Sequence, residues 1–267
     1  MTDRILLFIP CYNCAPQIGR VLRQLRGGVA AHLAEILVLD NGSRDGTIDE
    51  ALKAAAGLDG PPVTIARNKS NYHLGGSHKA AFAYATGRGF SHVLVLHGDD
   101  QGRLDDVLPV LERGDHRAYD ACLGARFMTG SQLEGYSLVR RLGNTVFNLM
   151  FTTVTGRRIH DLGSGLNLFA RAVFTDPQVT RCSDDLRFNV FLLLGLIDRR
   201  YRLMFFPISW REEDQVSNAR LVPQSLRTLG IGWDYLARRD HFRVADHRDR
   251  PVVEYAFDIL SQGCTYG

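Results

Sequence analysis

Short apolar runs alternate with segments of helical periodicity along the first part of the chain. Continuous apolar residues, typical of strands buried on both faces, occupy 5–9, 36–39, 63–65 and 93–96. Apolar residues at helical spacing follow these runs within 18–25, 47–56, 77–85 and 107–111. Strands and helices in this alternation build a parallel sheet with helices on both faces. We therefore predict an α/β fold with a doubly wound, mostly parallel sheet, in which residues 1–125 form a Rossmann-like nucleotide-binding half.

The pattern changes after Arg126. A polar, glycine-containing loop covers 129–135, an apolar helix is expected around 146–151, and later strands are expected at 165–169 and 203–206. We predict that these segments complete the same domain.

A charged stretch marks the end of that domain. It runs from Arg238 to Arg250, so we predict one domain over 1–237 and a charged C-terminal extension over 238–267. An apolar stripe at helical spacing comes just before it and consists of Leu226, Leu229, Trp233 and Leu236. We expect this stripe to pack in the core, the commoner role, and keep a helix lying on a membrane surface as the alternative.

Composition excludes several classes of protein. The chain has 267 residues, 45% hydrophobic and 23% charged, with a net charge of +3, so nothing in its overall charge favours nucleic acid. No apolar run reaches the ~18 residues of a membrane span, and the first residues lead straight into a strand-like run, so we expect a cytoplasmic protein. Of the five cysteines, Cys11 and Cys14 form a Cys-x-x-Cys typical of thiol-redox proteins, which is one alternative function.

Candidate chemistry gathers where the apolar runs end. The run 93–96 is followed by His97, Gly98, Asp99, Asp100 and Gln101. Ligands of open α/β sheets bind just beyond the carboxyl ends of the strands, and carboxylate oxygens there suit Mg²⁺ or Mn²⁺. A solvated turn with a helix cap is the alternative, because Asp is common in both.

Two other strand ends carry polar residues. Pro10, Cys11, Tyr12 and Asn13 follow the first run, and Asp40, Asn41, Gly42 and Ser43 follow the second. At one sheet edge these segments would combine an aromatic ring, a carboxylate directed at a base or ribose, and a metal site. That combination fits a sugar nucleotide.

In this order the motifs resemble family 2 of the glycosyltransferases. The family's Asp-Asp-Gly-Ser is intact apart from Asn41, whereas His97 stands at the first position of its Asp-x-Asp and Asp99 at the second. Asn71 with Gly75 and Gly76 is similar to a further family segment. Gly124-Ala125-Arg126 is similar to the family's Gly-Ser-Arg, and Asp161-Leu162-Gly163-Ser164-Gly165 is similar to the Asp-x-x-Ser-Gly of the branch that uses dolichyl or polyprenyl phosphate.

The resemblance implies a GT-A fold, a UDP- or GDP-sugar donor, a divalent metal and inversion at the anomeric carbon. It implies metal binding by Asp99, with Gln101 as a further oxygen ligand. His97 could donate to ribose or phosphate, bind the metal, or be structural. The implied donor site comprises Pro10, Tyr12, Asn13, Asp40, Gly42, Ser43, Asn71, Gly76, His97, Gly98 and Arg211.

The resemblance also implies an acceptor half over residues 126–237. Its acceptor site would comprise Arg126, Arg140, Arg141 and Ser164, and its catalytic residues would be Asp99, Asp161 and Arg126. The preferred acceptor is a polyprenyl phosphate, which implies peripheral contact with the inner face of the membrane.

The chemistry of the acceptor decides whether a base is needed. A phosphate monoester is already ionised at neutral pH, since its second pKa is about 6. A hydroxyl of a soluble glycan or natural product, the alternative acceptor, needs a general base such as Asp161, Asp184 or Asp185. A non-catalytic protein that binds nucleotide sugars is a further alternative, and the oligomeric state stays open.

Overall fold

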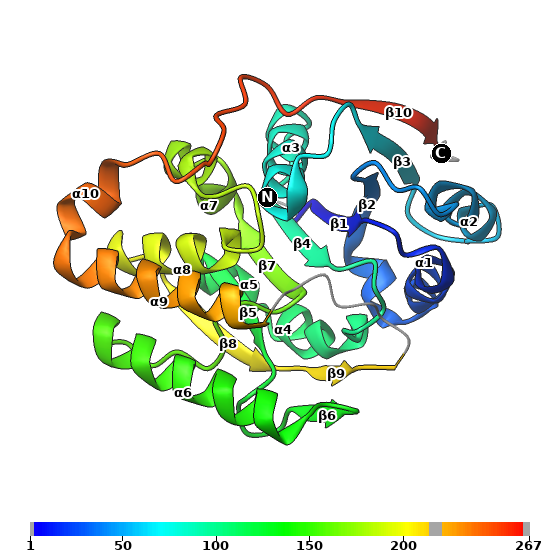
Figure 1. Ribbon diagram of the computed structural model, residues 1–267. Helices are drawn as coiled ribbons and strands as arrows, with labels where there is room; N and C mark the ends of the chain where they lie inside the picture. The colour runs from blue at the N-terminus through cyan, green and yellow to red at the C-terminus, as the bar shows by residue number, and fades with distance from the viewer. Residues whose placement is uncertain (1–2, 214–220, 264–267) are drawn as a thin grey trace.

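One mixed sheet forms the centre of the molecule (Figure 1). The computed structural model describes residues 3–213 and 221–263. The strands of this sheet are β1 (Ile5–Cys11), β2 (Leu33–Asp40), β3 (Val63–Asn68), β4 (His92–Leu96), β5 (Ala121–Ala125), β7 (Leu166–Ala170), β8 (Leu203–Pro207) and β10 (Phe257–Gln262). Their order in space is β10-β3-β2-β1-β4-β7-β5-β8. A small second sheet pairs β6 (Gln132–Glu134) with β9 (Ser209–Arg211).

Helices cover both faces of the central sheet. They are α1 (Ala15–Arg23), α2 (Thr47–Ala55), α3 (His73–Gly87), α4 (Leu108–Glu112), α5 (Asp115–Ala118), α6 (Leu138–Thr155), α7 (Arg171–Phe174), α8 (Phe188–Asp198), α9 (Leu221–Ala237) and α10 (Arg239–Val244). The short 3₁₀ helices are η1 (Gln24–Arg26), η2 (Gly28–His32), η3 (Leu104–Val107) and η4 (Pro177–Arg181). Within the described residues, no helix combines the length and apolarity needed to cross a bilayer.

The central strands carry apolar residues at consecutive positions because successive side chains point into two different cores. Leu6 and Phe8 of β1 belong to the core that includes α3 and α8 residues, whereas Leu7 and Ile9 belong to the core formed with α1. The predicted nucleotide-binding half is confirmed in its topology, since β3, β2, β1 and β4 are adjacent and parallel. The sheet is mixed because β7 runs antiparallel between β4 and β5.

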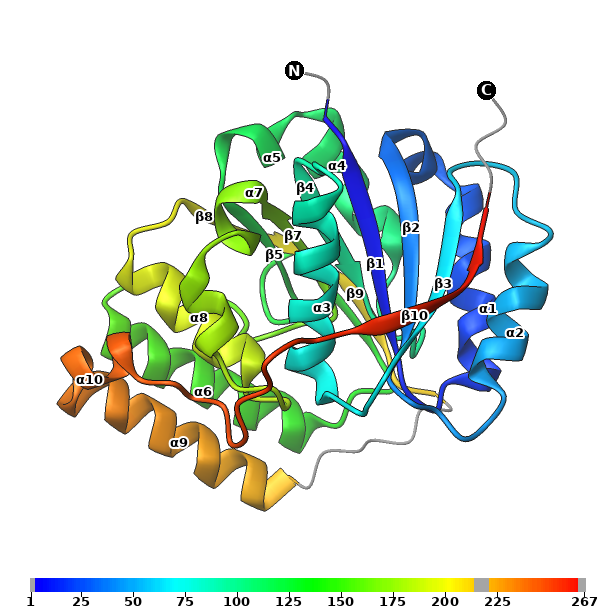
Figure 2. The same cartoon turned by 90° about the horizontal axis from the view of Figure 1, so that it is seen from above.

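The end of the chain corrects the predicted domain boundary. Strand β10, inside the segment 238–267 that the charge pattern marked as an extension, pairs antiparallel with β3 at the edge of the sheet. Figure 2 shows this strand crossing alongside α3 to reach the sheet. The extended segment between α10 and β10 therefore returns the chain to the nucleotide-binding half.

The expectation of a core role for the stripe on α9 was wrong. Leu226, Leu229, Trp233 and Leu236 are 42–65% exposed. Two other α9 residues, Ile231 and Tyr235, are buried in its place. The helix therefore presents apolar side chains to solvent as well as to the protein.

Candidate active site

The three polar strand ends meet at one edge of the sheet. Asp40 is the register partner of Cys11, and the Asn41 N–H donates to the Cys11 carbonyl at 2.8 Å. The Gly98 N–H donates to the Pro10 carbonyl at 3.1 Å. The ends of β1, β2 and β4 are therefore hydrogen-bonded to one another.

The loops after β1 and β2 are fastened by their own side chains. The Asn13 N–H donates to Ser43 Oγ at 2.8 Å, and the Arg44 N–H donates to Asn13 Oδ1 at 3.0 Å. Asn13 adopts a left-handed conformation with φ 50°, which Asn tolerates better than most residues. Tyr12 stays 41% exposed beside these loops. Asn13 and Ser43 thus shape the site, whereas Tyr12 leaves its ring open to a ligand.

Asp40 lies at the base of the edge, with its side chain only 1% exposed. Its carboxylate accepts hydrogen bonds from the Gly42 and Ser43 N–H groups and from Arg67 Nε, the last at 2.9 Å. Gly42 has φ 82°, a conformation that favours glycine. Arg67 was missed at the sequence level, although it is the register partner of Asp40 on the neighbouring strand β3.

Asn41 joins the edge to the loop before α3. Its Nδ2 donates to Asn71 Oδ1 at 2.9 Å, and its Oδ1 accepts from Asn68 Nδ2 at 2.9 Å. An amide both donates and accepts here, which a carboxylate at this position could not do.

Gly76, another residue of the predicted donor site, has a packing role, because an added Cβ would lie 2.5 Å from Tyr72 Cβ.

Asp99 has no cationic side chain within hydrogen-bonding distance among the described residues, and its carboxylate accepts only from the Gln101 N–H, at 3.3 Å. Burial, together with the neighbouring Asp100, raises the pKa of Asp99 to about 6. Gly98 fits closely beneath it, since an added Cβ would lie 2.7 Å from Cys11 Sγ. The site therefore holds one desolvated carboxylate beyond β4 to which no described cationic side chain is hydrogen-bonded.

Asp100, the second carboxylate after β4, forms ion pairs with two arginines. With 1% of its side chain exposed, it binds Arg20 Nε at 2.6 Å and also Arg211. Arg211 further donates to the Asp100 carbonyl at 3.0 Å. The guanidinium predicted to reach the donor diphosphate is thus bound to Asp100 in this structure.

His97 is partly buried, and its buried Nε2 atom has no hydrogen-bond partner among the described residues. The His97 backbone N–H donates to the Gly165 carbonyl at 3.0 Å. Burial, aided by Arg126, lowers the pKa of His97 to about 4. Its ring lies 6.2 Å from that of His78 on α3. His97 is therefore a neutral imidazole at neutral pH.

Arg126 and Asp161 form a buried ion pair. Arg126 Nε donates to Asp161 Oδ2 at 2.8 Å and Nη2 donates to Oδ1 at 2.9 Å. The Arg126 guanidinium also lies over the rings of Phe127 and Trp210, at 5.2 and 5.0 Å. Although burial opposes its charge, Asp161 holds the pKa of Arg126 above its usual value. Asp161 therefore balances the charge of Arg126.

The other predicted acceptor residues differ in their surroundings. Arg140 Nη1 donates to Glu212 Oε2 at 2.5 Å. Arg141 is exposed and has no side-chain partner among the described residues. The hydroxyl of Ser164 is buried and donates to the Leu166 carbonyl at 3.2 Å. Of these three side chains, Arg141 alone is unpartnered within the described chain.

Asp184 and Asp185, the other candidates for a general base, also form ion pairs with cationic side chains. Asp184 Oδ1 accepts from Lys79 Nζ at 2.6 Å and from the Tyr255 hydroxyl at 2.7 Å. Asp185 accepts from Arg187 Nε at 2.9 Å, and although burial opposes it, this contact holds the pKa of Asp185 below its usual value.

Comparison with known proteins identifies the family of this chain. Residues 7–176 match the model of "Glycosyl transferase family 2". The chain belongs to this family. Within it, the chain is 25% identical over 215 residues to polyprenol monophosphomannose synthase of Mycolicibacterium smegmatis, covering 80% of this chain and 79% of that protein. It is 26% identical to undecaprenyl-phosphate mannosyltransferase of Micrococcus luteus over 62% of this chain and 66%, just under two thirds, of that protein.

The fold agrees with this membership. Glucosyl-3-phosphoglycerate synthase of Mycobacterium tuberculosis superposes with a TM-score of 0.62 at 16% identity, over 88% of this chain and 80% of that one. The predicted GT-A fold and the resemblance to the polyprenyl-phosphate branch are therefore confirmed.

The glycosyltransferase edge also offers donors suited to a divalent cation. Asp99 and Gln101 supply oxygen atoms, which Mg²⁺ and Mn²⁺ prefer, and among the described residues no cationic side chain is hydrogen-bonded to Asp99. Within residues 3–213 and 221–263, no three His, Cys, Asp or Glu side chains gather closely enough to hold a metal by themselves. Two protein ligands with substrate phosphates and water are the usual arrangement for Mg²⁺.

The cysteines of the redox alternative lie beneath this edge. Cys11 and Cys14 are 2% and 4% exposed. The contact with Cys14, together with burial, raises the pKa of the Cys11 thiol well above its usual value. Since the thiolate is the reactive form, this environment suits packing rather than thiol chemistry.

Proposed function

We propose that this glycosyltransferase moves a sugar from a UDP- or GDP-sugar to a polyprenyl phosphate, with inversion at the anomeric carbon. The names of the mycobacterial and Micrococcus relatives support a polyprenyl-phosphate acceptor. The arrangement of charges at the sheet edge supports the donor, and two exposed helices support the acceptor.

The donor's base is proposed to meet Asp40 and Arg67. Uracil and guanine both present a ring N–H next to a carbonyl, so a carboxylate can accept the N–H while a guanidinium donates to the carbonyl. Asp40 Oδ2 and Arg67 Nε stand 2.9 Å apart and offer that pair of functions. The corresponding edges of adenine and cytosine present the opposite pattern of donors and acceptors, so we expect neither base in the donor.

The leaving diphosphate is proposed to lie beyond Asp99. With Asp99 and Gln101 holding it, a divalent cation would neutralise the charge that develops on the departing diphosphate. The ionised phosphate oxygen of the acceptor attacks the anomeric carbon from the face opposite the diphosphate. Its new bond to that carbon forms as the bond between the carbon and the diphosphate oxygen breaks. No base is required, in keeping with the cation partners of Asp161, Asp184 and Asp185.

The observation that carries the lipid acceptor is an apolar surface on α6 and α9, which run side by side in Figure 1. We call it the α6–α9 surface. On α6, Leu138, Val139, Leu142, Val146 and Leu149 are 58–80% exposed, and on α9, Leu226, Leu229, Trp233 and Leu236 are 42–65% exposed. Contiguous exposed apolar groups of this extent mark interaction sites. We propose that this surface rests on the membrane and makes the protein peripheral to it.

Arginines at the start of α6 would receive the phosphate head. Arg141 is exposed and Arg140 lies beside it on the same helix, over the ring of Tyr136 at 4.9 Å. Arginine binds phosphate with two parallel hydrogen bonds. A polyprenyl phosphate whose head is held here would have its hydrocarbon tail along Leu138 and Leu142 of the same helix.

The test compares acceptors in two physical forms. Transfer is measured to a long polyprenyl phosphate in vesicles, to a short water-soluble isoprenyl phosphate, and to hydroxyl acceptors, with products identified by mass spectrometry. We expect Leu142→Glu and Trp233→Glu to lower transfer in vesicles at least tenfold and to leave transfer to the soluble phosphate within about twofold. Leu52→Glu is the matched control, since Leu52 is a 36% exposed leucine on α2.

Two results would contradict the proposal. Transfer to hydroxyl acceptors alone would replace the lipid phosphate with a soluble acceptor. Equal losses for Leu52→Glu and Trp233→Glu would remove the α6–α9 surface from the explanation.

A further inference from the structure

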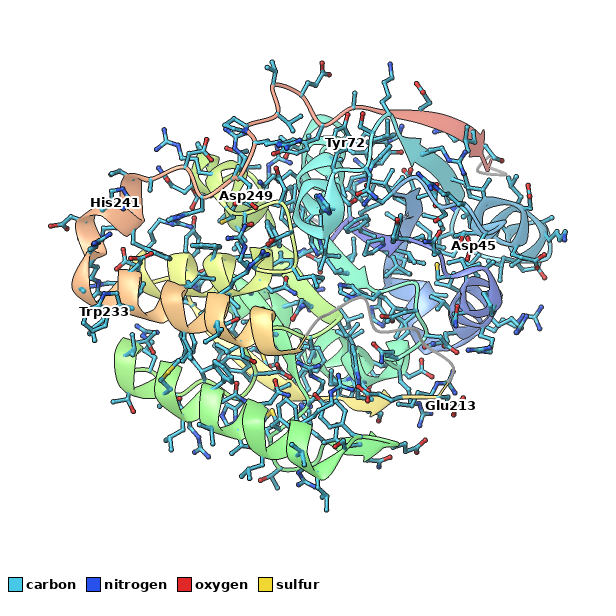
Figure 3. The ribbon with its side chains drawn as sticks, viewed as in Figure 1. Asp45, Tyr72, Glu213, Trp233, His241 and Asp249 are labelled. Atoms are coloured by element: carbon cyan, nitrogen blue, oxygen red, sulfur yellow. The ribbon has the colours of Figure 1, made fainter. Side chains whose placement is uncertain are left out.

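A cavity lies away from the candidate active site. It has a volume of about 310 Å³, within the range of small-molecule sites, and lies between η4, the second half of α8, and α10 with the residues after it. Figure 3 places Asp45, in the donor loop after β2, and His241, on α10, on opposite sides of the molecule. The proposed reaction therefore makes no use of this cavity.

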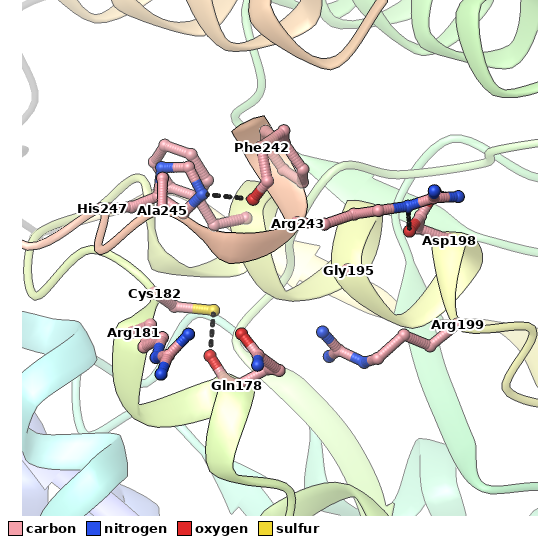
Figure 4. A pocket seen from close by; sticks show the side chains of 11 residues that line it. Gln178, Arg181, Cys182, Gly195, Asp198, Arg199, Phe242, Arg243, Ala245 and His247 are labelled. Carbon is pink, nitrogen blue, oxygen red and sulfur yellow. Dashed lines mark hydrogen bonds and ion pairs between the residues drawn. The ribbon is translucent and has the colours of Figure 1, made fainter. Parts of the chain in front are cut away.

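Arginines dominate its lining. Arg181, Arg199 and Arg243 line the cavity, with Asp198 as its one carboxylate (Figure 4). Asp198 is bound by Arg243 at 2.6 Å and by Arg239 at 2.8 Å. Two cations therefore share this one buried carboxylate.

The remaining arginines increase the positive charge. Arg199 is balanced by Asp176 at 3.0 Å. Arg181 donates to the Val244 carbonyl at 3.2 Å, and no carboxylate lies within ion-pair distance of it among the described residues. Around this space four arginines thus meet three carboxylates, those of Asp176, Asp198 and Asp240, which leaves one positive charge in excess. Such an excess beside a cavity attracts an anion.

An aromatic wall stands opposite the charges. The Phe191 ring stacks on His247 at 4.2 Å and on Phe242 at 5.7 Å, both at 22°. The His247 Nε2–H donates to the Phe242 carbonyl at 2.9 Å, and burial lowers the pKa of His247. A neutral, apolar wall on one side and guanidinium groups on the other suit a ligand with an anionic head and a small apolar body.

We propose that this cavity binds a phosphate ester, held by Arg181 and Arg199 and lying against Phe191. Guanidinium groups pair with phosphate oxygens through charge-assisted hydrogen bonds. The ester is either a soluble small molecule or the head of an anionic lipid, because both present the same phosphate. This site is independent of the reaction proposed above.

The experiment titrates the protein with inorganic phosphate and with glycerol 3-phosphate by calorimetry, in saturating UDP so that the donor site is filled. We expect saturable binding that Arg181→Gln weakens at least tenfold, the lower end of the cost of a lost hydrogen bond to a charged group. Ala245→Leu should weaken it similarly by filling the cavity without changing the charge. Arg26→Gln, which changes an exposed arginine on η1, is the control and should bind as the wild type does, whereas Arg141→Gln reports on phosphate bound at the proposed acceptor site.

A second arm identifies the source of the phosphate. Flotation with vesicles of phosphatidylcholine, with and without phosphatidic acid, is compared for the wild type and Arg181→Gln. Loss of binding to phosphatidic acid in the variant, with weak binding of the soluble esters, would identify a lipid head. Tight binding of glycerol 3-phosphate would identify a soluble ester.

Other outcomes would overturn the proposal. These are the absence of saturable phosphate binding in both arms, equal affinity of Arg181→Gln and wild type, or a loss in Arg141→Gln alone, which would assign the phosphate to the acceptor site. Thermal melting of each variant verifies that it is folded.

Discussion

Separating the buried pair of Arg126 and Asp161 tests both the stability and the mechanism of this protein. The Asp161 carboxylate accepts from Arg126 Nε at 2.8 Å, Nη2 at 2.9 Å and the Arg126 N–H at 2.9 Å, and from the Gly163 N–H at 3.1 Å. The two side chains are 14% and 2% exposed. Asp161→Ala therefore leaves a buried guanidinium without its counter-charge and several donors without an acceptor.

The expected loss of stability is large. Removing one partner of a buried pair costs about 3–5 kcal/mol, whereas replacing both partners with apolar groups can be nearly neutral. A domain's whole free energy of unfolding is about 5–15 kcal/mol. We expect Asp161→Ala to lose about 3 kcal/mol or more, and the double variant Arg126→Met with Asp161→Ala to lose less than the two single variants added together.

Urea denaturation of the wild type, Asp161→Ala, Arg126→Met and the double variant measures this coupling directly. Single losses that add up fully in the double variant would show that the two groups do not interact. A loss below about 1 kcal/mol for Asp161→Ala would contradict the desolvation argument.

The same position separates the two mechanisms. Asp161→Asn keeps an oxygen that can accept from Arg126, so with a phosphate acceptor we expect appreciable activity and a change mainly in acceptor KM. A fall in kcat of about 10²–10⁴ in a variant of unchanged stability would instead make Asp161 a general base.

Three further predictions concern the donor edge and the core behind it. Asp99→Ala should abolish transfer and weaken Mn²⁺ binding in the presence of UDP, measured by electron paramagnetic resonance; full activity of this variant, or of the wild type in excess chelator, would contradict the assignment. Replacing Cys11 and Cys14 together by Ser should leave turnover within a few-fold, and a large loss that follows the redox buffer would revive the thiol-redox alternative. Burial lowers the pKa of His78 to about 3, below its unfolded value of about 6.5. The unfolded chain therefore takes up the proton first as the pH falls, and stability present above pH 6.5 is lost toward the folded pKa at about 1.4 kcal/mol per pH unit. Urea denaturation of His78→Phe should show a loss between pH 6.5 and 5 that is about 2 kcal/mol smaller than in the wild type, and equal losses would contradict it.

The sequence predicted strands well wherever both faces of the sheet are covered. Strands β1 and β4 are buried along their whole lengths, and β2 is buried at every position but Ala34, so each contains a run of consecutive apolar residues that is easily recognised. Strand β10 is an edge strand with mostly exposed residues, and it follows the charged stretch beginning at Arg238. Its place in the sheet depends on pairing with β3, which no local pattern in the segment indicates.

Helix α9 shows a different limit. Periodicity identifies an apolar stripe but not what lies opposite it. Ile231 and Tyr235 are buried, while Leu229 and Trp233 on the same helix are exposed, because the helix is apolar on more than one side. Which side faces the protein is decided by tertiary packing.

At the active site, the sequence located the charged groups but not their partners, and the partners decide what each charge can do. Asp40, Asp100, Asp161 and Asp184 are each bound by at least one arginine or lysine that is 27 or more positions away or on another element. A carboxylate paired in this way balances a buried cation and is poorly placed to take up a proton or a metal. Asp99 is the exception among the candidates, since it is desolvated and, within the described part of the chain, no arginine or lysine is hydrogen-bonded to it; the charge of Arg126 acts on it only from farther away. The charge that a diphosphate and its cation would meet is therefore that of Asp99, and Arg141 is the corresponding exposed charge on the proposed acceptor side.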